Sequence, residues 1–137
     1  MIHDIDRRVV AMGALVTLAI AIPPVVVIAA LKSGDVVGRE SNLWVVGAVA
    51  ILVAFAAGGV VAGRRRPDMP FAHSAAAAAV ADVAILGYVA IRHAIEHRGT
   101  NWVSLALLFQ IGISLALLGG HFALRARRPA RHERGVT

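Results

Sequence analysis

Asp82 is the residue of this chain whose position most strongly suggests chemistry, because it lies inside the apolar stretch SAAAAAVADVAILGY, residues 74–88. In a membrane-spanning helix that begins near Phe71, the helical rise places Asp82 roughly 16 Å into the bilayer. A charged carboxylate is costly at that depth, and protonation lowers the cost. The position predicts either a titrating site for protons or cations, or a neutral group that hydrogen-bonds a neighbouring helix. We favour the neutral group, because the apolar stretches hold a single acid.

Two sets of groups are predicted partners for Asp82. Gln110 lies eight residues inside the outer end of the last apolar stretch, and Asp82 lies about nine residues inside the outer end of its own. Because antiparallel neighbours bring equal depths together, we expect an Asp82–Gln110 hydrogen bond. Pro23 and Pro24 also free two backbone carbonyl groups at a similar depth, since proline donates no hydrogen bond. A helix kink is the favoured interpretation of this pair, with a bond to Asp82 as the alternative.

Two histidines form a second candidate site. His73 and His121 lie two to three residues inside the same ends of their stretches, so they are a predicted interfacial pair. Gln110, Ser114 and His121 follow i, i+4, i+11 spacing and share one helix face. His73 is half a turn out of phase with Asp82, so we expect no proton relay along that helix. Two histidines without a carboxylate make a poor zinc site, and contact with lipid headgroups is the favoured role.

The sequence contains no motif of an enzyme or a cofactor site. It has no cysteine, which excludes disulfides, thiolate metal sites and cysteine nucleophiles. It also lacks a P-loop, a nucleophile elbow, a zincin helix and a dinucleotide fingerprint. We therefore expect a non-enzymatic protein without a catalytic residue, cofactor or metal.

Four long apolar stretches must position the candidate residues. Of the 137 residues 58% are hydrophobic and 16% are charged, and the charges cluster between these stretches. Each stretch has about 20 to 23 residues, enough to cross roughly 30 Å of hydrocarbon as a helix, the form in which a backbone in lipid satisfies its own hydrogen bonds. The short connections predict an all-α, integral membrane four-helix bundle with up-down-up-down antiparallel topology. The predicted spans are 9–31, 43–63, 71–90 and 102–124, in a single domain of residues 1–128 followed by a polar basic tail, 129–137.

The distribution of basic residues predicts the orientation. The N-terminal segment, the second connection and the tail carry ten lysines and arginines, whereas the first and third connections carry four. By the positive-inside rule, both termini are cytoplasmic. The first stretch continues ten residues past the cleavage-like triplet Ala19-Ile20-Ala21, so we expect it to remain as a span.

Small residues recur at helical spacing on the second and fourth stretches. Such stripes let helix backbones approach closely, either within one chain or between two copies. The predicted packing positions are Gly58, Gly59, Gly63, Gly112, Ala116 and Gly120.

The net charge of +6 suits a membrane surface better than nucleic acid. Aromatic residues are sparse and are not interleaved with arginine, and no helix-turn-helix pattern occurs. We expect the partners to be the lipid bilayer, anionic headgroups that contact the cytoplasmic arginines, and a second copy or another membrane protein. The arginine, alanine and valine bias indicates a bacterial source, and hence the bacterial inner membrane.

The segment GGVVAGRRRPDMPFAH, residues 58–73, resembles the junction of spans two and three in a family of small uncharacterised bacterial four-span membrane proteins. That family has a Gly-Gly-x-x-Ala-Gly-Arg end to span two, a His early in span three and a Gly-Gly pair late in span four. The chain departs from it at Ser74, where the family has glycine, and near Leu124, where a further glycine is usual. The resemblance implies the four-span fold and no activity. The matching positions are Gly58, Gly59, Ala62, Gly63, Arg64, His73, Gly119 and Gly120.

These observations predict a structural or accessory multi-pass membrane protein that assembles with itself or with a partner. The alternative is a small proton- or cation-coupled transporter or channel subunit in which Asp82 titrates.

Overall fold

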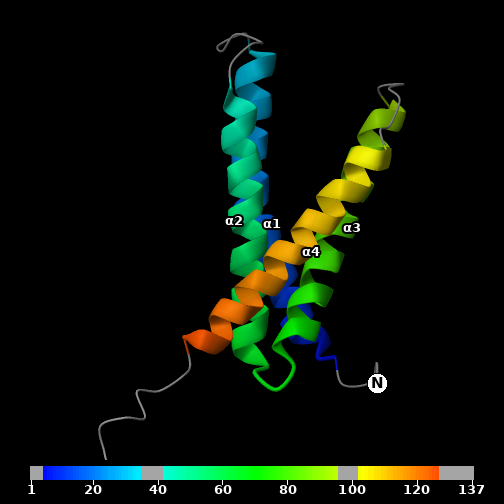
Figure 1. Ribbon diagram of the computed structural model, residues 1–137. Helices are drawn as coiled ribbons and strands as arrows, with labels where there is room; N and C mark the ends of the chain where they lie inside the picture. Colours follow the sequence, from blue (N-terminus) through cyan, green and yellow to red (C-terminus); the bar gives the residue numbers. More distant parts are fainter. Residues whose placement is uncertain (1–4, 35–41, 96–101, 127–137) are drawn as a thin grey trace, which may run out of the picture.

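The computed structural model describes residues 5–34, 42–95 and 102–126, and this part of the chain is all-helical (Figure 1). All four helices are long and apolar enough to cross a membrane. Each one contains the corresponding predicted span and extends it by a few residues at one or both ends. The predicted basic tail, residues 129–137, lies outside the described residues. The helices are α1 (Arg7–Ser33), α2 (Leu43–Arg65), α3 (Pro70–Ile95) and α4 (Trp102–Arg125).

The helix ends follow from local chemistry. Asp6 caps α1, because its carboxylate accepts a hydrogen bond of 2.9 Å from the backbone N–H of Arg8. Pro70 occupies the first position of α3, where a missing N–H costs no helical hydrogen bond. Helix α1 runs unbroken through Pro23 and Pro24.

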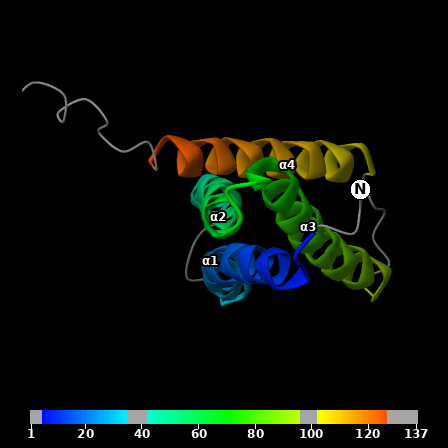
Figure 2. The same cartoon turned by 90° about the horizontal axis from the view of Figure 1, so that it is seen from below.

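The helices are arranged with α2 and α3 in the middle. Figure 2 shows α1 and α4 on opposite sides, and in the described residues these two helices do not pack against each other. Helices α1 and α2 lie side by side, whereas α3 and α4 lean away from them toward the top of Figure 1. Helix α4 crosses α2 obliquely (Figures 1 and 2). The four helices therefore come together at the end where α2 turns into α3.

Glycines make the crossing of α2 and α4 close. A Cβ atom on Gly59 would collide with the carbonyl oxygen of Ala116, and one on Gly119 would collide with that of Ala56. Farther along the same contact, a Cβ on Gly63 would lie 3.1 Å from the Cα of Gly120. Backbones that approach this closely leave no room for a side chain, so glycine is required at the crossing.

A second close contact joins α1 to α2. A Cβ on Gly58 would collide with Oγ1 of Thr17 and lie 2.7 Å from the carbonyl oxygen of Gly13. The two adjacent glycines of α2 thus face different neighbours, Gly58 toward α1 and Gly59 toward α4. All the small residues predicted to pack are used within one chain, Gly112 included.

The outer surface is apolar. Leu15, Val83 and Leu107 are each about 60% exposed, and many other large apolar side chains are exposed along all four helices. The buried core instead consists mostly of alanine, such as Ala54, Ala62 and Ala81. Small residues inside and large ones outside are the pattern of helices that pack in lipid.

Candidate functional site

Asp82 lies at the middle of α3, twelve residues after Pro70 and thirteen before Ile95. Its side chain is buried, with 4% of its surface exposed. A Cβ on Gly112 of α4 would lie 2.8 Å from Oδ2 of Asp82 and 3.0 Å from Oδ1. The carboxyl group therefore lies directly against the backbone of Gly112, and its Oδ2 atom has no hydrogen-bond partner among the described residues.

The predicted hydrogen bond between Asp82 and Gln110 is not formed. Gln110 is exposed on the outer side of α4, two residues before the Gly112 backbone that Asp82 touches. Two residues are about 200° of helical rotation, so the two positions point in nearly opposite directions. Gln110 lies only two residues along the axis of α4 from the residue that Asp82 touches, but the rotation of α4 turns its side chain away.

The alternative partners of Asp82, the carbonyl groups freed by the two prolines of α1, are also not bonded to its Oδ2 atom. These carbonyls belong to Ala19 and Ile20, which are exposed. The buried positions of α1 lie on another face, which includes Ala14, Thr17 and Ala21. The proline pair thus leaves its free carbonyls away from the buried face of α1.

A small crevice opens beside Asp82 between α2, α3 and α4. Its volume is about 70 Å³, which is more than the space that one water molecule needs. Among the described residues that line it, all but Asp82 are apolar, and the Asp82 carboxyl group is their single polar side-chain group. The apolar lining consists of Ile51, Leu52, Phe55, Ile85, Leu86, Val89, Leu105, Leu108, Ile111 and Gly112. We refer to this space as the Asp82 crevice.

His73 is fully buried, so its side chain does not make the predicted contact with lipid headgroups. Its Nε2 atom accepts a hydrogen bond of 3.1 Å from the backbone N–H of Asp6, and its Nδ1 atom lies 2.9 Å from the carbonyl oxygen of Met69. A ring nitrogen that accepts carries no proton, so Nδ1 carries it and donates to Met69. His73 is therefore a neutral imidazole that ties the start of α1 to the start of α3.

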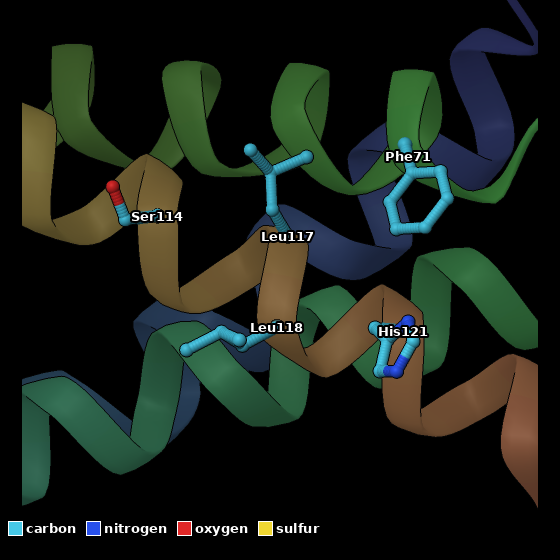
Figure 3. A pocket seen from close by; sticks show the side chains of 5 residues that line it. All are labelled: Phe71, Ser114, Leu117, Leu118 and His121. Carbon is cyan, nitrogen blue, oxygen red and sulfur yellow. The ribbon is translucent and has the colours of Figure 1, made fainter.

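The two histidines do not form a hydrogen-bonded pair, because both ring nitrogens of His73 are already engaged. His121 is half-buried on α4, and its ring makes an edge contact with Phe122 at a centroid distance of 6.3 Å. Figure 3 shows His121 and Phe71 at one end of a shallow groove and Ser114 at the other. Among the described residues no cluster of three or more histidines or acids could hold a metal ion.

Three polar residues outside the predicted sites have defined roles. The Ser74 hydroxyl donates a hydrogen bond of 2.8 Å from α3 to the carbonyl oxygen of Gly59 in α2. The Thr17 hydroxyl bonds its own helix at Gly13, and Asp6 combines the cap of α1 with the backbone contact to His73. The sequence held a signal for each: an Asp before the first apolar helix, and single hydroxyl residues within apolar runs.

Charged residues close the same end of the molecule. Nε of Arg66 lies 3.3 Å from Oδ1 of Asp68, and Nη1 of Arg66 lies 3.8 Å from Oδ2 of Asp6. The second ion pair links the turn after α2 to the start of α1. All three side chains are more than one-third exposed, so these ion pairs add little stability. The His73 hydrogen bonds are therefore the main polar contacts that hold the start of α1 against the start of α3.

Comparison of the chain with protein family models, curated proteins and solved structures gives no match. The resemblance to bacterial four-span proteins therefore stays a prediction.

Proposed function

We propose that this chain is a non-enzymatic, accessory protein of the bacterial inner membrane that assembles in the bilayer with itself or with a partner. Its four helices are long and apolar enough for a multi-pass membrane protein. The observation that carries the proposal is the buried Oδ2 atom of Asp82, for which the described residues provide no hydrogen-bond partner. A buried polar atom without a partner is costly, so a site that retains one is expected to receive its partner from outside the chain.

The other buried polar side chains support this interpretation. Thr17, His73 and Ser74 all bond to backbone groups, so none is left to complete the Asp82 site. They also do not converge on a shared cavity, as the reacting groups of an enzyme would. The Asp82 crevice has room for a small donor group, such as an amide or an ammonium group carried by a membrane segment of a partner.

The proposed topology is up-down-up-down, with both termini in the cytoplasm. The support for it is the ten-to-four distribution of basic residues, which would also place arginines against anionic headgroups. A reporter active in the periplasm, fused after Thr137, is expected to stay silent, while the same reporter inserted after Gly34 is active. Reporter activity after Thr137 would contradict the proposed orientation and place the C-terminus in the periplasm.

Photocrosslinking tests the assembly proposal. A photoreactive residue replaces Leu108, which is 52% exposed and lines the Asp82 crevice. The control replaces Val83, which is 65% exposed and adjacent to Asp82 but outside the crevice lining. In native membranes we expect an adduct from position 108 that weakens in the Asp82→Leu background, and a weaker adduct from position 83. An adduct at position 108 that is indifferent to Asp82→Leu would remove Asp82 from the assembly.

A second function uses the same unpartnered oxygen: a proton- or cation-coupled transporter or channel in which Asp82 titrates. Proteoliposomes that contain a pH dye or a cation dye distinguish it. This function requires flux with the wild type and none with Asp82→Asn, which keeps the size of the side chain but cannot titrate. Equal flux in both, or none in either, excludes it.

A further inference from the structure

The surfaces through which this chain could contact a second copy are limited by its own packing. The glycine faces of α2 and α4 are occupied within the chain, by Gly59 against Ala116 and by Gly63 against Gly120. An interface between copies must therefore use another face. The outer side of α4 carries two exposed polar residues well inside the helix, Gln110 and Ser114.

Gln110 is the informative residue on this outer side. It lies eight residues from Trp102 and fifteen from Arg125, well inside the helix, and its side chain is exposed. Its amide makes no hydrogen bond to any described residue. An amide with both donor and acceptor unmet is expensive in hydrocarbon, and interhelical hydrogen bonds of such groups hold membrane helices together.

The residues around Gln110 form a regular seam along α4. We define the α4 seam as Val103, Leu107, Gln110, Ser114, Leu117 and His121, all exposed or half-buried. Their spacings alternate between four and three residues, which is the heptad spacing of a helix that packs lengthwise against another. A single polar residue in such a seam sets the register of the pair.

The centre of the seam suits close approach. The Ser114 hydroxyl donates a 2.8 Å hydrogen bond to the backbone carbonyl of Gln110, so it needs no partner across an interface. Beside the seam, Leu117 and Leu118 line the groove with Phe71 of α3 (Figure 3). The groove has a volume of about 580 Å³, room for large apolar side chains of an opposing helix.

We propose that two copies of this chain pack α4 against α4 along this seam, with the two Gln110 amides hydrogen-bonded to each other across a two-fold axis. This inference rests on the proposed assembly in the bilayer and names its surface. Two copies share one orientation in the membrane, so the same residue meets itself at the same depth. The amide of glutamine is self-complementary, because it both donates and accepts. The Asp82 crevice lies on the other side of α4 and stays open for a different partner.

Cysteine crosslinking tests the seam, and the absence of native cysteine makes each single variant unambiguous. Leu107→Cys places a thiol on the seam, and Leu108→Cys is its matched control on the crevice side. The two leucines are adjacent and 59% and 52% exposed. In proteoliposomes with excess lipid, oxidation by copper phenanthroline is expected to give several-fold more covalent dimer from Leu107→Cys.

The contribution of Gln110 is measured in the Leu107→Cys background. We expect Gln110→Leu to reduce the dimer yield at limiting protein roughly three- to tenfold, the effect of losing interhelical hydrogen bonds in membranes. Gln110→Asn keeps an amide and is expected to retain more of the dimer than Gln110→Leu. Equal yields for these two variants and wild-type Gln110 would overturn the amide pair.

The crosslinking outcomes distinguish failure of the α4 seam from failure of the proposed function on which it rests. More dimer from Leu108→Cys than from Leu107→Cys overturns the α4 seam but leaves assembly intact. No dimer from either variant also overturns the seam, and photocrosslinking from the crevice then decides whether a different partner is bound. Absence of both self-association and a crosslinked partner removes the proposed function as well.

Discussion

Replacing Gly59 by alanine tests the closest helix contact of the molecule. A Cβ at this position would overlap the carbonyl oxygen of Ala116 and lie 2.7 Å from its carbonyl carbon and Cα, where ordinary contact begins at 3.4 Å. The difference, 3.4 Å less 2.7 Å, requires α2 and α4 to separate by at least about 0.7 Å. These obstructing atoms are backbone, which cannot rotate aside as a flexible side chain would.

The expected cost follows from two opposing effects. Overpacking against a rigid neighbour lowers the free energy of unfolding by up to about 3 kcal/mol. The higher helix propensity of alanine raises it by about 1 kcal/mol. The free energy of unfolding should therefore fall by about 2 kcal/mol. Gly87→Ala is the matched control, because a Cβ on Gly87 meets nothing within 4 Å and should leave stability equal or higher.

Reversible unfolding from detergent micelles into sodium dodecyl sulfate provides the measurement. Dyes on cysteines that replace the exposed Arg65 and Arg125 report the separation of α2 from α4 by energy transfer. The matched pair isolates the helix contact from the general effect of adding a methyl group. A Gly59→Ala protein as stable as Gly87→Ala would refute the close α2–α4 crossing.

Three further predictions concern the polar residues. The Asp82→Leu variant should have a free energy of unfolding equal to or above that of the wild type, because leucine is nearly isosteric and removes an unpartnered carboxyl oxygen. A loss above about 1 kcal/mol would reveal a hydrogen bond inside the chain. Ser74→Ala should lower the free energy of unfolding by about 0.6 kcal/mol through loss of the bond to Gly59, and no change would mean that the hydroxyl contributes nothing. His73→Phe should reduce the hydrogen-exchange protection of the Asp6 amide. Unchanged protection of this amide in the variant would contradict the contact.

The positions of the four helices follow from residue type and run length alone. A backbone in hydrocarbon must satisfy its own hydrogen bonds, so a run of about 20 apolar residues has one suitable conformation. This is why the helices contain the predicted spans 9–31, 43–63, 71–90 and 102–124. Capping by Asp6 and the start of α3 at Pro70 are equally local, because neighbouring residues in the chain produce them.

The neighbours of each side chain required the folded molecule. Depth along the helices predicts that Asp82 meets Gln110, yet α4 turns Gly112 toward the acid and Gln110 toward the outside of the molecule. His73 sits at the expected end of α3, yet it bonds to the backbone of Asp6 and Met69 instead of meeting His121.

The physical reason lies in the solvent. In a water-soluble protein, the apolar face of a helix is the buried one, so the periodicity of apolar residues in the sequence indicates how the helix is rotated about its axis. In lipid both sides of a helix are apolar, and the buried side is distinguished by small residues rather than by hydrophobicity. In an alanine-rich chain small residues occur on every face, so the rotation of each helix is set by how all four pack together. Residue order thus determines which segments form the long apolar helices and where they end. The packed arrangement determines that the acid of α3 faces a glycine and that the amide of α4 faces outward.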